Sequence, residues 1–307
     1  MGAGQDGRAD VHGFAKTLDF DRIQRATRAP GTATITAVRT TSPARIDVIA
    51  LLLALTAALI ARALLQVRLS QAGLPEPVAS DLSYLVVPLI LATLSLPLLS
   101  KHRHFIAALF CTRPLTLRVV VAAIVVGLLF RVATGSLLVA RIAFGWQVND
   151  NPAAIEGPLL HMQCPPAASM LLGFAVSSIL IPLLEEFVHR GFVQTFLHRH
   201  GAFISVGASA TVFAVFHPAS GMVFAFAGGL LLGAMYRLSG CLWLPIITHS
   251  VINLTPQFTW RCMSLQWNPQ ADSLPLWIPG LVAMCLFALA LCGGLWLLHA
   301  AIRCRTP

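Results

Sequence analysis

Long apolar runs separated by short polar segments dominate the chain. Runs of about 17–25 residues are long enough to cross the hydrocarbon core of a membrane as helices. The sixteen-residue runs are short for a crossing, so we expect those helices to tilt or to pack against neighbouring helices. We therefore expect an all-α fold, a polytopic transmembrane helix bundle. The pattern predicts about eight spans, at residues 46–66, 82–99, 119–140, 169–198, 203–218, 221–238, 241–256 and 276–298.

The composition agrees with this pattern. Of the 307 residues, 57% are hydrophobic and only 11% are charged. A water-soluble fold of this length exposes far more charge, so soluble enzymes and disordered tails are poor interpretations. The sequence predicts an integral membrane protein whose surface contacts the lipid bilayer.

The positive charge lies between the apolar runs. The formal net charge is +9, but Lys and Arg are spread over the loops at 100–118, 199–202 and 237–240 and the C-terminal tail. A nucleic-acid partner would need a basic face on a soluble domain, so we expect none. Basic loops stay on the cytoplasmic side of a membrane. The distribution therefore predicts that the N-terminus and the C-terminus are both cytoplasmic.

Two adjacent glutamates lie inside one of the apolar runs. Glu185 and Glu186 are two of only four glutamates in the chain. A charged residue at a helix centre costs roughly 2.5–3.5 kcal/mol, so these groups need partners inside the bundle. Glu186 and Arg190 are four residues apart and share a helix face, whereas Glu185 is rotated by about 100°. The spacing predicts a Glu186–Arg190 pair and an unpaired Glu185.

Three further polar residues lie at a similar predicted depth. At 1.5 Å per residue, Glu185 and His217 both lie about 20 Å above the same inner turn, and His249 and Asn253 lie roughly 14 to 20 Å above the turn at Gly240. A single intramembrane histidine or Glu–Arg pair is often structural. Four polar residues from three helices at one level instead favour a site that binds water.

The residue types allow two kinds of chemistry. A carboxylate held away from bulk water suits a general base that removes a proton from water, and imidazole and amide N–H groups stabilise an oxyanion. This combination would hydrolyse a peptide bond inside the membrane. Glu185, His217 and His249 are also a zinc ligand set with one open position, so spacing alone leaves a metal-free and a zinc-dependent mechanism open.

The seven cysteines add little to this picture. They include no CxxC pair, which argues against zinc ribbons and redox motifs. Cys164 and Cys262 fall in loops that we place outside the cytoplasm, where a disulfide could form. Nothing else depends on that bond.

Three sequence blocks lie on successive hydrophobic helices. They are Glu185-Glu186-x-x-x-Arg190, Phe213-x-x-x-His217 and His249-x-x-x-Asn253. In this order the blocks resemble the CPBP family of intramembrane proteases, which includes the type II CAAX prenyl endopeptidases and relatives of the lysostaphin-resistance protein. The resemblance covers about residues 168–256.

The resemblance implies a role for each site residue. Its members have been described both as metalloproteases and as glutamate proteases, so zinc stays open as a cofactor. The chain departs from the pattern at His189, where the family usually has an aromatic or apolar residue, and a di-metal Glu186-x-x-His189 motif would need more carboxylates than the chain supplies. By resemblance, Glu185 activates the water, His217, His249 and Asn253 bind water and the oxyanion, and Arg190 holds Glu186.

The resemblance also divides the chain and suggests a partner. We expect a polar, basic, partly disordered cytoplasmic segment at 1–45 with no signal peptide, three accessory helices at 46–140, the protease core at 168–256 and a last helix at 276–298. The expected substrate is a membrane-borne protein or peptide. In eukaryotic relatives it is a prenylated CAAX protein, whereas bacterial members are linked to membrane-protein maturation, peptide processing or immunity to bacteriocins. We expect a bacterial cytoplasmic membrane.

Two other function classes fit parts of the sequence. The same fold without catalysis would be a binding or immunity module in which the polar cluster is structural. A proton-coupled transporter would use a midplane carboxylate as a relay, but it usually contains an internal repeat, and we see none. Substitution of Glu185 separates these classes from a protease.

Overall fold

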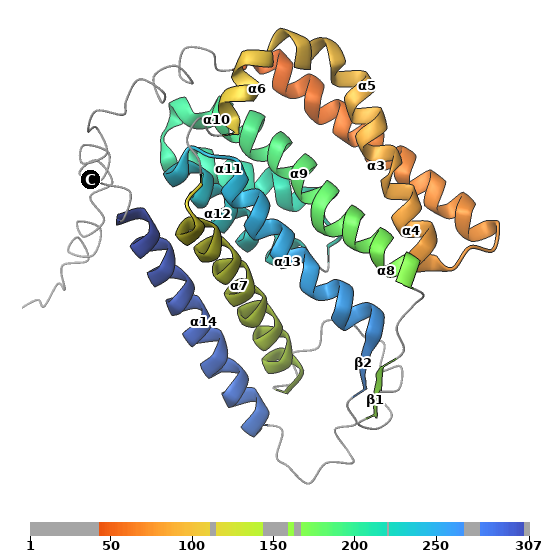
Figure 1. The fold of residues 1–307 in the computed structure, drawn as a ribbon, viewed down its shortest axis with the longest axis vertical. Helices are drawn as coiled ribbons and strands as arrows, with labels where there is room; N and C mark the ends of the chain where they lie inside the picture. Colours follow the sequence, from red (N-terminus) through yellow and green to blue (C-terminus); the bar gives the residue numbers. More distant parts are fainter. Residues whose placement is uncertain are drawn as a thin grey trace, which may run out of the picture.

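The computed structural model describes residues 43–110, 115–143, 159–162, 167–219, 221–266 and 277–303. Figure 1 shows the helices side by side, with α3 and α5 at one edge of the bundle and α7 and α14 at the other. The helices are α3 (Arg45–Gln71), α4 (Glu76–Tyr84), α5 (Val86–Lys101), α6 (Arg103–Leu109), α7 (Leu117–Ala143), α8 (Ala167–Gly173), α9 (Ile181–Glu186), α10 (Thr195–Leu197), α11 (Ala202–Val215), α12 (Met222–Ser239), α13 (Trp243–Cys262) and α14 (Trp277–Arg303).

The expectation of an all-α bundle is confirmed. Each of the eight predicted segments falls on a helix, and the segment at 82–99 is divided between α4 and α5. Three further apolar helical stretches are shorter, at Ala202–Val215, Trp243–Leu254 and Gly280–Gly294, and the last two are parts of the longer helices α13 and α14. The number of crossings therefore stays a prediction. Helices long and apolar enough to cross a membrane span Arg45–Gln71, Val78–Lys101, Leu117–Leu137, Ala167–His200 and Met222–Ser239.

One small element differs from the expectation. The strands β1 (Leu159–Met162) and β2 (Met263–Gln266) pair as a two-stranded antiparallel ribbon. β2 directly follows α13, and β1 comes shortly before α8, so both strands lie at the same end of the bundle. By pairing, the two strands provide hydrogen-bond partners for each other's backbone N–H and C=O groups. Cys164 lies outside the described residues, so the disulfide with Cys262 stays a prediction.

The loops predicted to be cytoplasmic lie at one end of the bundle. The Leu242 N–H donates to the Leu109 carbonyl at 2.9 Å, which joins the start of α13 to the end of α6. Arg237 contacts His198, which joins the end of α12 to the turn after α10. Gly240, at φ +62°, ends α12 in the left-handed conformation that glycine adopts without strain. The grouping fits the predicted topology, whereas its side of the membrane stays a prediction.

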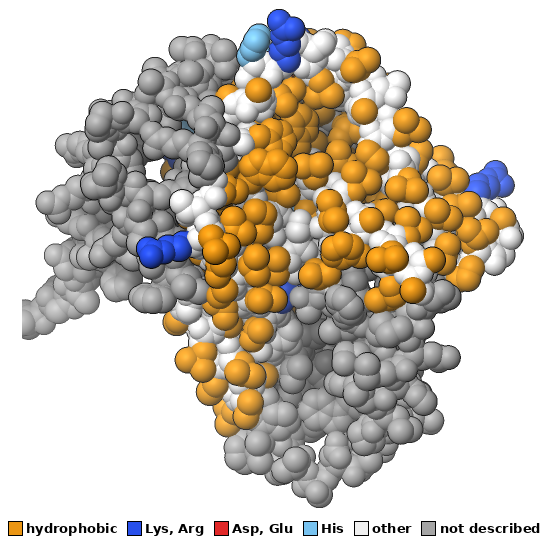
Figure 2. Space-filling view, in the orientation of Figure 1, with side chains coloured by type: hydrophobic (Ala, Val, Ile, Leu, Met, Phe, Trp, Pro, Cys, Tyr) orange, Lys and Arg blue, Asp and Glu red, His pale blue; other side chains and the backbone are white. Residues whose placement is uncertain are grey.

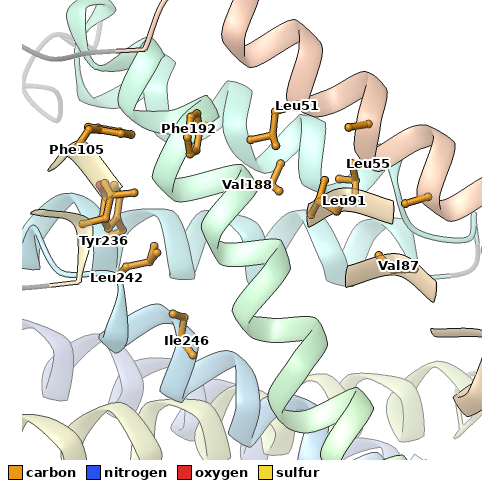
Figure 3. Packing of buried hydrophobic residues seen from close by; sticks show 13 residues of the cluster. Leu51, Leu55, Val87, Leu91, Phe105, Val188, Phe192, Tyr236, Leu242 and Ile246 are labelled. Carbon is orange, nitrogen blue, oxygen red and sulfur yellow. The ribbon is translucent and has the colours of Figure 1, made fainter. Parts of the chain in front are cut away.

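The interior is packed from several helices. Figure 3 shows Leu51 and Leu55 of α3 against Val188 and Phe192 of the long central helix. Lipid tails are as apolar as leucine, so close van der Waals packing rather than burial from water holds such helices together. The outer face in Figure 2 is largely hydrophobic, with Lys and Arg side chains mostly near its margins. A surface of this kind suits contact with lipid.

Small residues bring the helices close together around the site. A Cβ atom on Gly229 of α12 would lie 3.0 Å from the Ala210 Cα of α11. A Cβ atom on Gly127 of α7 would lie 2.9 Å from the Thr248 carbonyl oxygen of α13, and the Thr248 hydroxyl donates to the Ala123 carbonyl at 3.0 Å. These close approaches place α11, α12 and α13 in fixed positions around the polar residues.

Candidate active site

The helix that carries both glutamates is irregular on either side of them. Residues 167–200 form one continuous rod in which α9 lies between two π-helical segments, Phe174–Leu180 and Phe187–Gln194. In a π-helix each N–H donates to the carbonyl five residues earlier, and such segments often occur at functional sites. The Ile181 N–H follows this pattern and donates to Val176.

The residue after Ile181 is a proline, and it leaves the Ser177 carbonyl free to accept a hydrogen bond from another helix. The same π pattern would direct the N–H of residue 182 to the Ser177 carbonyl, but Pro182 has no N–H. The Asn253 side-chain amide, from α13, donates to the Ser177 carbonyl at 3.0 Å instead. Pro182 therefore explains why Asn253 is anchored to the central rod at this point.

The predicted pair between Glu186 and Arg190 is present. Arg190 Nε lies 3.0 Å from Glu186 Oε2, and both side chains are fully buried. Arg190 Nη2 donates to the Gly229 carbonyl at 3.1 Å, and the guanidinium carbon lies 4.6 Å from the centre of the Phe213 ring. The buried charges therefore compensate each other, and the guanidinium is fixed to α11 and α12.

Glu186 also holds His249. His249 Nδ1 lies 2.9 Å from Glu186 Oε1, and because a carboxylate only accepts, the ring nitrogen donates. On the other side of the ring, His249 Nε2 lies 3.7 Å from Glu185 Oε2, which is too long for a hydrogen bond. Glu186 thus orients the imidazole so that its second nitrogen faces Glu185.

The two glutamates face different surroundings. The Glu185 side chain is 26% exposed, whereas Glu186 is fully buried. Glu185 lines a pocket of about 230 Å³, large enough for several water molecules. Glu186 and Arg190 are not among its lining residues. The pocket is lined by Tyr84, Ser177, Ile181, Glu185, His217, His249 and Asn253.

The pocket lining agrees with the depths predicted from the sequence. Glu185 comes from α9, His217 follows α11, and His249 and Asn253 come from α13. The expectation that these four polar residues meet is therefore confirmed.

The hydrogen bonds assign the nitrogen atoms of the two imidazoles. His217 Nδ1 lies 2.9 Å from the Phe213 carbonyl, so this nitrogen donates, as Nδ1 of His249 does. A neutral ring then has a lone pair on Nε2. The expectation that both imidazoles present an N–H to an oxyanion therefore needs refinement, because Nε2 donates only from a ring that carries a second proton.

The zinc interpretation is not supported by the geometry. Glu185, His217 and His249 line the same pocket, but within the part of the chain that the structure describes no three His, Cys, Asp or Glu side chains converge closely enough to hold a metal ion. The same finding gives no support to a di-metal site at Glu186 and His189.

His189, the departure from the family pattern, is packed in the interior. Its side chain is fully buried, and Nδ1 donates to the Glu185 carbonyl at 2.7 Å. Its ring meets Phe213 and Phe216 edge-on, with centroids 5.2 and 5.8 Å away. The Ser209 hydroxyl donates to the His189 carbonyl at 2.9 Å. His189 therefore supports the backbone of Glu185.

Sequence reasoning gave no role to two residues of this site. Tyr84 enters the pocket from α4, a helix that we assigned to the accessory region. Phe213 lies at the centre of the polar cluster, with ring centroids 4.6 Å from His217 and 5.7 Å from His249. The available signals were that Tyr84 is one of only two tyrosines and that Phe213 precedes His217 by one helical turn.

A comparison with known protein families decides the assignment of this region. The family model described as type II CAAX prenyl endopeptidase Rce1-like matches residues 167–255. Residues 167–255 are an Rce1-like domain. The matched segment contains all of the predicted site residues. No curated protein and no solved structure matches the chain significantly.

The match to the Rce1-like family supports a class of activity at the level of the family. This family consists of CAAX-type intramembrane proteases, which are hydrolases. The apolar helices agree with an integral membrane protein. The binding-module and transporter alternatives receive no support from the match.

Proposed function

We propose that this protein is an intramembrane endopeptidase in which Glu185 activates a water molecule. The observation that carries the proposal is the pocket where Glu185, His217, His249 and Asn253 meet, with the Glu186–Arg190 pair buried behind it. A membrane interior normally excludes charged groups and water. A pocket with a partly exposed carboxylate at this depth suits hydrolysis of a peptide bond.

The first step uses Glu185 as the general base. A water molecule in the pocket donates one hydrogen bond to the Glu185 carboxylate and a second to the lone pair of His217 Nε2. Its oxygen attacks the carbonyl carbon of the scissile bond as its proton passes to Glu185. His217 therefore orients the water, because its Nδ1–H is already engaged by the Phe213 carbonyl.

The oxyanion needs donors on the other side of the pocket. Glu185, Glu186 and Arg190 together have one negative charge in excess, so one further proton on His249 makes the cluster neutral. A protonated His249 keeps Nδ1–H on Glu186 and presents Nε2–H to the pocket. The second N–H of the Asn253 amide is the other donor, since its first bonds Ser177.

Collapse of the tetrahedral intermediate completes the reaction. Glu185 returns its proton to the nitrogen of the leaving group as the carbon–nitrogen bond breaks. The new carboxyl end retains the oxygen of the water, and the new amino end retains the proton. Glu185 is then unprotonated and ready for the next water molecule, so it acts first as a base and then as an acid.

The substrate is expected to reach the pocket from the bilayer. We propose a membrane-borne protein or peptide, processed either at a CAAX-type C-terminus or during bacterial membrane-protein maturation. The first alternative follows from the family and the second from the expected location in a bacterial cytoplasmic membrane. The largely apolar outer face would allow an anchored substrate to approach sideways through lipid.

The proposal is tested by comparing membrane-protein termini in cells. Cells with the wild-type chain should contain cleaved termini that are missing from cells with Glu185→Gln. Glu76→Gln is the matched control, because Glu76 is exposed at the start of α4. Equal termini in wild-type and Glu185→Gln cells, with equal protein levels, would remove Glu185 as the base.

A further inference from the structure

A second charged residue lies within a helix of membrane-crossing length and makes no ion pair with any other described residue. Arg62 occupies the apolar run of α3 and is partly buried. Its Nη2 donates to Gln66 Oε1 at 3.3 Å, but its buried Nε has no hydrogen-bond partner. Among the described residues it makes no ion pair. An intramembrane arginine is costly, so an unneutralised one indicates a functional site.

Arg62 lies against the wall of the pocket. Its guanidinium carbon is 3.5 Å from the centre of the Tyr84 ring, a cation–π contact that fixes its position. Tyr84 lines the same pocket as Glu185. The phenol group of Tyr84 is within electrostatic range of the Arg62 guanidinium and of the carboxylates of Glu185 and Asp81. A single aromatic ring therefore lies between the Arg62 guanidinium and the pocket that contains Glu185.

The Arg62 side chain is held by a neighbouring helix, although Arg62 lies only about four residues before the end of the span predicted at 46–66. Arg62 precedes the last residue of α3, Gln71, by nine residues, or about 14 Å along the helix. Arginines near helix ends extend towards the interface. Arg62 instead stacks on Tyr84, which belongs to the neighbouring helix α4.

We propose that Arg62 binds a carboxylate of the peptide substrate and so determines which peptide bond lies over Glu185. This inference rests on the proposed function. A guanidinium binds a carboxylate with two parallel hydrogen bonds, and it does so most strongly where water is scarce. A substrate carboxylate approaching the pocket would be repelled by Glu185, and Arg62 is placed to offset that repulsion. The carboxylate is either the C-terminal group of the substrate or an Asp or Glu side chain.

The test uses the full chain in lipid vesicles and a synthetic library of apolar peptides. Each peptide is made with a free C-terminal carboxylate and with a C-terminal amide, and with or without one acidic side chain. The variants are Arg62→Gln, Arg62→Lys and the matched control Arg68→Gln, since Arg68 is exposed on the same helix. Mass spectrometry gives the rate and the position of each cut.

We expect wild-type protein to cleave the peptides with the recognised carboxylate about tenfold faster or more. Arg62→Gln should cleave both forms equally, Arg62→Lys should keep part of the preference, and Arg68→Gln should behave as wild type. A preference for the free C-terminus identifies the terminal carboxylate as the ligand. A preference that follows the acidic side chain identifies that group instead.

Two results would overturn the inference. One is a wild-type protein that cleaves all peptide forms equally, a result that requires no variant to fold. The other is an Arg62→Gln variant that is slower on every peptide but keeps the wild-type ratio and cut positions, which is what a purely structural arginine would give. Failure of the proposed function has a different signature, because Glu185→Gln would then cleave as fast as wild type.

Discussion

Replacing Pro182 with alanine tests how the central helix positions Asn253. An alanine at this position has the N–H that proline lacks, and the π pattern begun at Ile181 directs this N–H to the Ser177 carbonyl. The Asn253 amide then competes with a backbone donor for its only described partner. We expect the Asn253 side chain to lose its fixed position while the helix itself becomes no less stable.

The expected fall in kcat follows from the strength of the hydrogen bond between the Asn253 amide and the Ser177 carbonyl. A neutral hydrogen bond contributes about 0.5–1.5 kcal/mol net, and about 1.36 kcal/mol corresponds to a factor of ten in rate. We therefore expect Pro182→Ala to lower kcat about two- to tenfold. The thermal stability should stay equal or rise, because alanine is a better helix former than proline.

The assay is a double-mutant cycle on purified protein in lipid vesicles. Wild type, Pro182→Ala, Asn253→Ala and the double variant are compared for kcat on one cleaved peptide. If Pro182 acts through Asn253, the double variant should be no slower than Asn253→Ala alone. Pro97→Ala is the control, since Pro97 also lies within a helix but outside the pocket lining. Effects that simply multiply would refute the reasoning.

The same geometry supports three other predictions. Glu186→Gln should lower kcat about tenfold or more, because it removes the charge that supports a protonated His249 and leaves the buried Arg190 without its ion-pair partner. An unchanged kcat would contradict this. Gly229→Val should destabilise the protein by about 1–3 kcal/mol, because the new Cβ atom would lie 3.0 Å from Ala210. Gly207→Val is the control and should leave the stability unchanged, because the space around Gly207 is open. Thermal unfolding of the two variants measures this difference. Activity should survive exhaustive chelation, and a loss reversed by added zinc would restore the metal mechanism.

Much of the site could be predicted because its signals are local. The Glu186–Arg190 pair follows from a four-residue spacing on one helix, and Glu185 faces the pocket because it is one residue away on that helix. The common depth of Glu185 and His217 follows from counting residues from a shared turn. Periodicity and helical rise are fixed quantities, so these inferences need no tertiary structure.

The contacts between helices could not be predicted in this way. The bond between His249 and Glu186, and the approach of Tyr84 from α4, depend on how each helix is rotated and where the axes cross. One residue of helical rotation moves a side chain by about 100°, and packing of small residues such as Gly229 sets that rotation. The π-helical turns were missed as well, although Pro182 was a visible signal for one of them.

The central claim is tested most directly by the cleavage rate of Glu185→Gln in purified form. Wild type, Glu185→Gln and the exposed control Glu76→Gln would be reconstituted in the same vesicles at equal, folded amounts. General-base catalysis contributes about 10²- to 10⁴-fold, so we predict that Glu185→Gln is slower by at least about a hundredfold and that Glu76→Gln matches wild type. A Glu185→Gln rate within a few-fold of wild type would contradict the account.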